Sequence, residues 1–167
     1  MLSIRAETEH DRTAIDALHR AAFGGDAEAR LVEKLRADGL VASSLVAVVN
    51  DTVAGHILFS DLAVSVDGRP VAAVALAPVA VRPADQRRGI GSRLVRAGLE
   101  DVRGKGRAAV LVVGHPGYYP RFGFSAELAR KLASPYPGPA FMALELVRGA
   151  LAGRAGEVRY PAAFDGA

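Results

Sequence analysis

The chain has 167 residues, of which 50% are hydrophobic and 23% charged, so it can form one globular domain over residues 1–167 and is not disordered. It contains no cysteine, which excludes disulfides, thiolate metal sites and a cysteine nucleophile. The formal net charge is +3, and no apolar run is long enough to span a bilayer, so we expect a cytoplasmic protein with no membrane partner.

The first half of the chain changes from helical to strand periodicity. A short strand at residues 2–5 precedes two amphipathic helices, which begin after Asp11 and Asp26. Strand patterns then follow at residues 44–49, 53–64 and 71–81. The turn Asn50-Asp51 and the hairpin signal Asp67-Gly68 separate them.

The second half begins with a predicted helix over residues 88–103, in which apolar residues recur at helical spacing. A buried strand over 109–113 and a short helix or tight turn over 117–122 come next. The last predicted strand covers 141–147. It could pair within the domain or across two copies, so a homodimer is one of the two arrangements that it allows.

Pro78 interrupts the most apolar strand pattern in the chain. The run over 71–81 is apolar on both faces, which is typical of a central, doubly covered strand. A proline cannot donate to a sheet ladder, so it marks an edge, a break or a bulge. Because Val79, Ala80 and Val81 resume the strand pattern at once, we predict a bulge.

The turn Gln86-Arg87-Arg88-Gly89-Ile90-Gly91 lies between this strand and the predicted helix. The first N–H groups of a helix have no intrahelical partner, and the helix dipole adds positive potential there. Gly89 and Gly91 lack a Cβ, so a phosphate could approach the backbone between Arg88 and Ser92. Arg87 and Arg88 could add charge-assisted contacts. The turn therefore predicts a diphosphate site.

The glycines and arginines of this turn could also have a different role. The third glycine of a dinucleotide fingerprint is replaced by Leu94, the Gly-Lys pair of a P-loop is missing, and two glycines can simply open a helix. Arginines gather around the turn, as on a solvated helix face or in a nucleic-acid-binding domain. Aromatic residues do not alternate with these arginines, so we expect no nucleic-acid partner.

Two motifs together resemble a known family. The pattern Gln86-x-x-Gly89-x-Gly91 after an apolar strand resembles the acetyl-CoA signature of the GNAT acetyltransferase superfamily. The string over 118–124, with Tyr119 four residues ahead of Gly123-Phe124, resembles its second signature. The order of elements is similar along essentially the whole chain, most of all to small stand-alone bacterial N-acetyltransferases. The resemblance implies an α/β fold with a mixed, mostly antiparallel sheet. That sheet would be splayed between its fourth and fifth strands and have helices on both faces.

The resemblance also implies a cosubstrate, acetyl-CoA, and roles for individual residues. The pantetheine arm would pair with the backbone of Val79, Ala80 and Val81. The pyrophosphate would bind at Arg87, Arg88, Gly89, Ile90, Gly91 and Ser92. Tyr119 would protonate the departing CoA thiolate, since a tyrosine with a pKa of about 10 keeps its proton near neutral pH. A tyrosine that only packs or contacts substrate is the alternative.

The implied reaction is acetyl transfer to an amine-bearing small molecule or a protein amine, through a ternary complex, because no cysteine can hold the acyl group. A backbone N–H near Val79 would stabilise the oxyanion. The base is open between His115, His56, Asp61 and solvent. The histidines lack ligand spacing, so we expect no metal. A non-catalytic acetyl-CoA sensor is the alternative function. Residues 23–28 and the segment after Phe124 show no dominant acidic or aromatic cluster that would select the amine.

Overall fold

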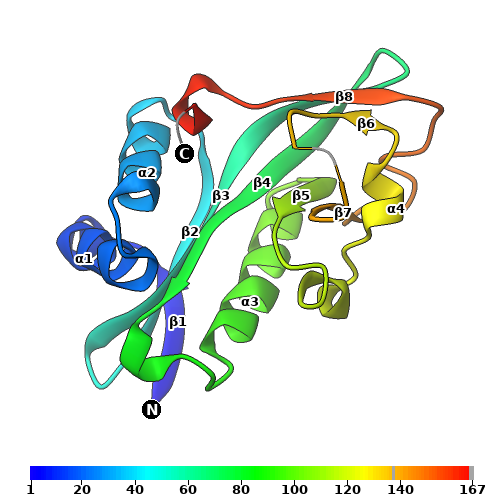
Figure 1. Cartoon of the computed structure of the whole chain (residues 1–167). Coiled ribbons are helices and arrows are strands. Elements are labelled where there is room, and N and C mark those ends of the chain that lie inside the picture. Colours follow the sequence, from blue (N-terminus) through cyan, green and yellow to red (C-terminus); the bar gives the residue numbers. More distant parts are fainter. Residues whose placement is uncertain (137, 166–167) are drawn as a thin grey trace.

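The strand patterns of the sequence form one twisted sheet (Figure 1). The structure is a computed structural model that describes residues 1–136 and 138–165; residues 137, 166 and 167 of the expected domain lie outside them. The sheet has the order β1-β2-β3-β4-β5-β7. These strands are β1 (Leu2–Ala6), β2 (Val41–Val49), β3 (Thr52–Val66), β4 (Arg69–Val81), β5 (Ala109–Val113) and β7 (Phe141–Glu145).

Helices cover both faces of this sheet, as predicted. Helices α1 (Arg12–Phe23) and α2 (Ala27–Ala37) lie on one face, and α3 (Ile90–Gly104) lies on the other (Figure 1). Two apolar cores result, one including residues of α2 and the other residues of α3. The remaining helices are short: α4 (Ala126–Ala129), η1 (Glu9–Asp11), η2 (Pro83–Asp85), η3 (Tyr119–Phe122) and η4 (Ala162–Phe164). No helix within the described residues is both long and apolar enough to cross a membrane.

Strand β4 carries the predicted bulge. Ile57 of β3 faces Val79, whereas Phe59 faces Leu76, so the stretch of β4 between them contains an extra residue at Ala77-Pro78. The bulge lets β4 continue to Val81 beside β3 although Pro78 has no N–H to donate. The prediction made from Pro78 is confirmed.

The sheet is splayed where the sequence resemblance implied. All strand pairs along its main order are antiparallel except β4 with β5, which is parallel. That pairing covers Ala73–Ala109, Val74–Val110 and Ala75–Leu111 and then ends. Beyond Ala75, β4 continues beside β3, and no strand of the described residues pairs with the edge that would face β5.

The end of the chain differs from the prediction. The strand expected over 141–147 stops at Glu145, whose carboxylate accepts hydrogen bonds from the N–H groups of Gly149 (3.3 Å) and Leu151 (2.8 Å). This strand pairs with β5 inside the chain and is not the last one. Two short strands were missed, β6 (Leu132–Ala133) and β8 (Gly156–Arg159), and β8 pairs with both β3 and β6.

Candidate active site

A cleft of about 970 Å³ opens where β4 and β5 diverge. Its two long walls are residues 75–81 of β4 and residues 111–115, which run from β5 into the following loop. The bulge and the end of the parallel pairing together leave the β4 backbone facing this space instead of a neighbouring strand. The cleft is therefore a consequence of the sheet topology.

The start of α3 closes one end of the cleft, where Gln86, Arg87 and Gly91 line it. The Arg93 N–H donates to the Gly89 carbonyl at 3.1 Å and makes the first hydrogen bond of the helix. The three preceding helical N–H groups, from Ile90 onward, have no intrahelical acceptor and carry the positive end of the dipole. This end of the cleft is suited to a phosphate group.

Left-handed backbone at two positions shapes the turn. Arg87 has φ 67° and Gly89 has φ 79°, so the helix cannot begin at residue 88 as predicted and begins at Ile90. The Asp85 carboxylate links the two sides of the turn. It accepts a hydrogen bond from Arg82 Nε at 2.5 Å and forms an ion pair with Arg88 Nη1 at 3.6 Å. The Gln86 amide donates to the Val81 carbonyl at 3.0 Å.

The residues expected to bind the cofactor divide into two groups. Val79, Ala80, Val81, Arg87 and Gly91 line the cleft, whereas Arg88, Gly89, Ile90 and Ser92 do not. In the second group, the Arg88 side chain is 70% exposed and directed to Asp85. The Ile90 side chain is buried in the core under α3.

Tyr119 lines the cleft from the opposite wall. It is the first residue of η3 and only 7% exposed, and its ring makes edge contacts with Tyr118 and Phe124 at centroid distances of 5.1 and 5.7 Å. Gly114 leaves room for it, since a Cβ there would lie 2.3 Å from Tyr119 Cε2. Burial, with a smaller contribution from Tyr118, raises the pKa of Tyr119 to about 12, so the phenol keeps its proton.

Tyr118 joins the two sequence motifs in space. Its hydroxyl lies 2.9 Å from Ser92 Oγ in the first turn of α3, and the Arg121 guanidinium stacks over its ring at 4.4 Å. The hydrogen bond connects η3 to the start of α3. The turn over residues 86–91, called the phosphate turn below, and Tyr119 therefore lie at the same cleft, and this hydrogen bond links the elements that carry them.

The candidate bases have different surroundings. His115 lines the cleft. His56 and Asp61 do not line it, although they lie on β3 beside the central strand. Asp61 accepts a hydrogen bond from Arg107 Nε at 2.9 Å. His56 is fully buried, and its Nδ1 is 2.8 Å from His19 Nε2.

His56 belongs to a polar chain that ties α1 and α2 to the sheet. Its Nε2 lies 2.8 Å from Ser44 Oγ and 3.5 Å from Glu7. Glu7 also accepts two hydrogen bonds from Arg36, at 3.0 and 2.9 Å, and one from Ser44. Burial acts to raise the pKa of Glu7, but these hydrogen bonds outweigh it and hold the pKa at about 2. Burial lowers the pKa of His19 to about 3, so it is neutral in the fold.

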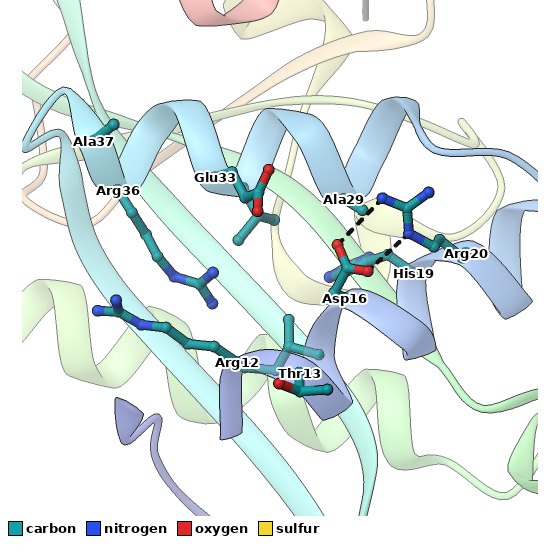
Figure 2. A pocket seen from close by; sticks show the side chains of 11 residues that line it. Arg12, Thr13, Asp16, His19, Arg20, Ala29, Glu33, Arg36 and Ala37 are labelled. Atoms are coloured by element: carbon teal, nitrogen blue, oxygen red, sulfur yellow. Dashed lines mark hydrogen bonds and ion pairs between the residues drawn. The ribbon is translucent and has the colours of Figure 1, made fainter. Parts of the chain in front are cut away.

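A second hollow of about 650 Å³ lies between α1 and α2 (Figure 2). Charged side chains of both signs line it, and Asp16 is paired there with Arg20 at 2.7 Å. None of the residues that the sequence singled out for the cofactor or the reaction lines this hollow. It is separate from the cleft between β4 and β5.

The far end of the cleft corrects the expectation that no aromatic cluster would be found. Its lining residues include Phe23, Glu28, Leu31, Tyr136, Tyr160 and Phe164. They come from the end of α1, the start of α2 and two segments near the end of the chain. Sequence patterns miss such a group because its members are far apart in the chain. The one signal in the sequence is that aromatic residues are scarce, at 6% of the chain, and that several of these few occur in the segments named above.

A metal site was not expected from the sequence. Among residues 1–136 and 138–165, no three side chains of His, Cys, Asp or Glu lie close enough together to hold a metal ion.

Comparison with known proteins identifies a family. The family model described as "Acetyltransferase (GNAT) domain" matches residues 3–126. The uncharacterised N-acetyltransferase YhbS of Escherichia coli strain K12 is 39% identical over 165 residues, which cover 97% of this chain and 98% of YhbS.

Two solved structures of similar proteins contain the cofactor. The crystal structure of Escherichia coli YhbS in complex with CoA has a TM-score of 0.89 at 38% identity, covering 98% of this chain and 92% of that one. A GNAT family acetyltransferase from Brucella melitensis in complex with acetyl-CoA has a TM-score of 0.82 at 35% identity, covering 99% of each chain. Fold, cleft and family model agree, and the chain belongs to the GNAT acetyltransferase family.

Proposed function

We propose that this protein, as one catalytic domain over residues 1–167, transfers the acetyl group of acetyl-CoA directly to an amine. The observation that carries the proposal is the course of the cleft. It runs from free helical N–H groups, past the unpaired edge of β4, to the buried phenol of Tyr119. The relatives solved with CoA and acetyl-CoA support the identity of the cofactor.

In this proposal the cofactor follows the cleft. Its pyrophosphate accepts hydrogen bonds from N–H groups at the start of α3 and a charge-assisted contact from Arg87. The pantetheine amides pair with the backbone of residues 79–81, whose other edge pairs with β3. The thioester then lies between β4 and Tyr119.

The proposed reaction is addition followed by elimination. The neutral amine nitrogen attacks the thioester carbonyl carbon, and a backbone N–H near Val79 stabilises the oxyanion. As the C–N bond is kept and the C–S bond breaks, Tyr119 donates its proton to the sulfur. The proton that leaves the amine passes to His115 or to solvent, and solvent reprotonates Tyr119. The products are the N-acetyl compound and CoA thiol.

The chain's lack of cysteine supports direct transfer. No thiol is present to carry the acetyl group as a thioester intermediate, which favours direct transfer with both substrates bound together. The amine acceptor is proposed to be a small molecule or a protein amine that enters the cleft.

The test is product detection with the whole protein. Acetyl-CoA and a panel of amines are incubated with it, thiol release is followed, and N-acetyl products are identified by mass spectrometry. We expect both signals to rise together with at least one amine class. Tight acetyl-CoA binding in calorimetry with no acetylated product across the panel would instead identify a non-catalytic sensor.

A further inference from the structure

The cleft passes through the sheet and has a half on each face. Leu76, Val112 and Tyr119 line it and belong to the core under α3. Leu31, Leu111 and Phe164 also line it and belong to the core on the face of α1 and α2. The phosphate turn opens α3, so a cofactor bound there occupies the half on the α3 face. The half on the other face is left for the second reactant.

Aromatic rings dominate this second half. The rings of Tyr136 and Tyr160 meet edge to face at 4.9 Å, and those of Tyr160 and Phe164 at 5.1 Å. Phe23, at the end of α1, lines the same half and leaves 45% of its surface exposed. Aromatic rings that line a cleft can bury the apolar surface of a ligand, and the faces of the rings attract cations.

Glu28 gives this half its charge. It lies in the first turn of α2, is half-buried and lines the cleft. Among the described residues that line the cleft it is the only acidic one, and no hydrogen bond or ion pair ties its carboxylate to the described part of the chain. Among the described lining residues, the one arginine is Arg87 at the phosphate end, and the one histidine is His115 in the loop after β5; no lysine lines the cleft.

We infer that the acceptor is a small primary amine with an aromatic or other flat apolar body, which enters as its ammonium form. Before the attack the ammonium group leaves Glu28 and loses one proton to solvent or to His115, so the nitrogen that reaches the thioester is neutral. The aromatic wall of Phe23, Tyr136, Tyr160 and Phe164 covers the body, and Glu28 draws in the ammonium group. An acidic acceptor is disfavoured, because its carboxylate would meet Glu28, while the lining arginine, Arg87, lies at the phosphate end of the cleft. This inference rests on the proposed acetyl transfer and names its substrate class.

The first measurement is binding without chemistry. Phenethylamine is titrated calorimetrically into the complex of the protein with CoA, which cannot transfer an acetyl group. We expect Glu28→Gln to weaken this binding about tenfold, the equivalent of one charge-assisted contact. Glu33→Gln is the matched control: it lies on the same helix but lines the hollow between α1 and α2, so binding should stay within about twofold.

The second measurement is turnover, with thiol release followed for phenethylamine and for glutamate. We expect kcat/KM for phenethylamine to be higher by at least about 100-fold, and Glu28→Gln to act mainly on KM. Equal rates for glutamate, or an unchanged KM in Glu28→Gln, would overturn the inference while acetyl transfer stood. Tight phenethylamine binding that Glu28→Gln weakens, with no acetylation of any amine, would support the subsite and overturn the proposed transfer.

Discussion

Tyr119 is only 7% exposed and lines the cleft, and it matches the tyrosine of the second family motif. The neighbouring phenol of Tyr118 also lines the cleft, but its hydroxyl lies 2.9 Å from Ser92 Oγ. A positioned general acid contributes a factor of about 100 or more to the rate. Tyr119→Phe should therefore lower kcat about 100-fold. Because the ring and its contacts remain, acetyl-CoA affinity should stay within about twofold, as measured by calorimetry. A fall in kcat of less than about threefold would show that the thiolate leaves without this proton.

The raised pKa of Tyr119 also has consequences at high pH. Its pKa is about 12 in the fold and about 10 in the unfolded chain. Between these values the folded state keeps a proton that the unfolded state has lost, so this contribution to stability is present below pH 10 and decreases as pH rises to about 12. Denaturant titrations from pH 9 to about 11.5 should show a shallower decline for Tyr119→Phe than for the original protein. Identical slopes would contradict the burial of this phenol.

Two of the three glycines of helix α3, Gly91 and Gly98, have different expected effects. A Cβ at Gly91 would lie 3.6 Å from the Tyr118 hydroxyl, an ordinary contact, but in the proposed site it would stand between the phosphate and the helix N–H groups. A Cβ at Gly98 would lie 2.2 Å from Phe59 Cε1 in the core. Gly91→Ala should weaken acetyl-CoA binding about tenfold with little change in unfolding free energy. Gly98→Ala should cost about 1–3 kcal/mol of stability.

Calorimetry and denaturant unfolding of both variants separate the two effects. If Gly91→Ala binds acetyl-CoA as tightly as the original protein, the phosphate does not approach the backbone at this glycine. If Gly98→Ala is as stable as the original, the contact with Phe59 relaxes more easily than the packing of the buried ring indicates.

The sequence predicted most of these elements because their signals are local. The hairpin at Asp67-Gly68 and the bulge at Pro78 each follow from one or two residues. The start of α3 was placed two residues early, since apolar spacing cannot show that Arg87 adopts a left-handed φ. Strands β6 and β8 were missed because they are short and acquire their pattern only by pairing with distant segments.

Glu7 joins α2, β2 and β3 through Arg36, Ser44 and His56. Its pKa is about 2 in the fold and about 4.5 when unfolded, so its contribution to stability is present above pH 4.5 and decreases as pH falls to 2. His19 also makes the folded state less stable as pH falls below about 6.5. Burial lowers its pKa to about 3, so the unfolded chain takes up a proton that the folded state does not. Glu7→Gln should cost about 2 kcal/mol at pH 7 and make the decline of stability below pH 4.5 shallower, because the contribution of His19 remains.

Denaturant unfolding at several pH values between 7 and 3 measures this effect. Glu157→Gln is the matched control, since its ion pair with Arg159 is exposed and 3.9 Å long, and its stability should change by less than about 0.5 kcal/mol. If the two variants lose equal stability, the chain from Glu7 to His19 does not fasten the helices to the sheet.

The two halves of the cleft differed in how well they could be predicted. The half on the α3 face is encoded by two compact motifs, around Gly89 and around Tyr119, and both were found. The aromatic half is assembled from Phe23, Tyr136 and Phe164, which only the folded sheet brings together. His56 was a candidate base because it lies on β3, but a strand pattern does not show that its side chain is bonded to His19 and Ser44.

The cleft is lined by residues of both cores, and in the proposed mechanism the two substrates enter it from opposite faces and meet beside Tyr119. The most direct test of this arrangement is the pattern of initial rates of thiol release, with acetyl-CoA and the fastest amine varied together. Direct transfer in a ternary complex predicts lines that intersect in a double-reciprocal plot. Parallel lines would show that the acetyl group is first held on the enzyme, and would contradict direct transfer.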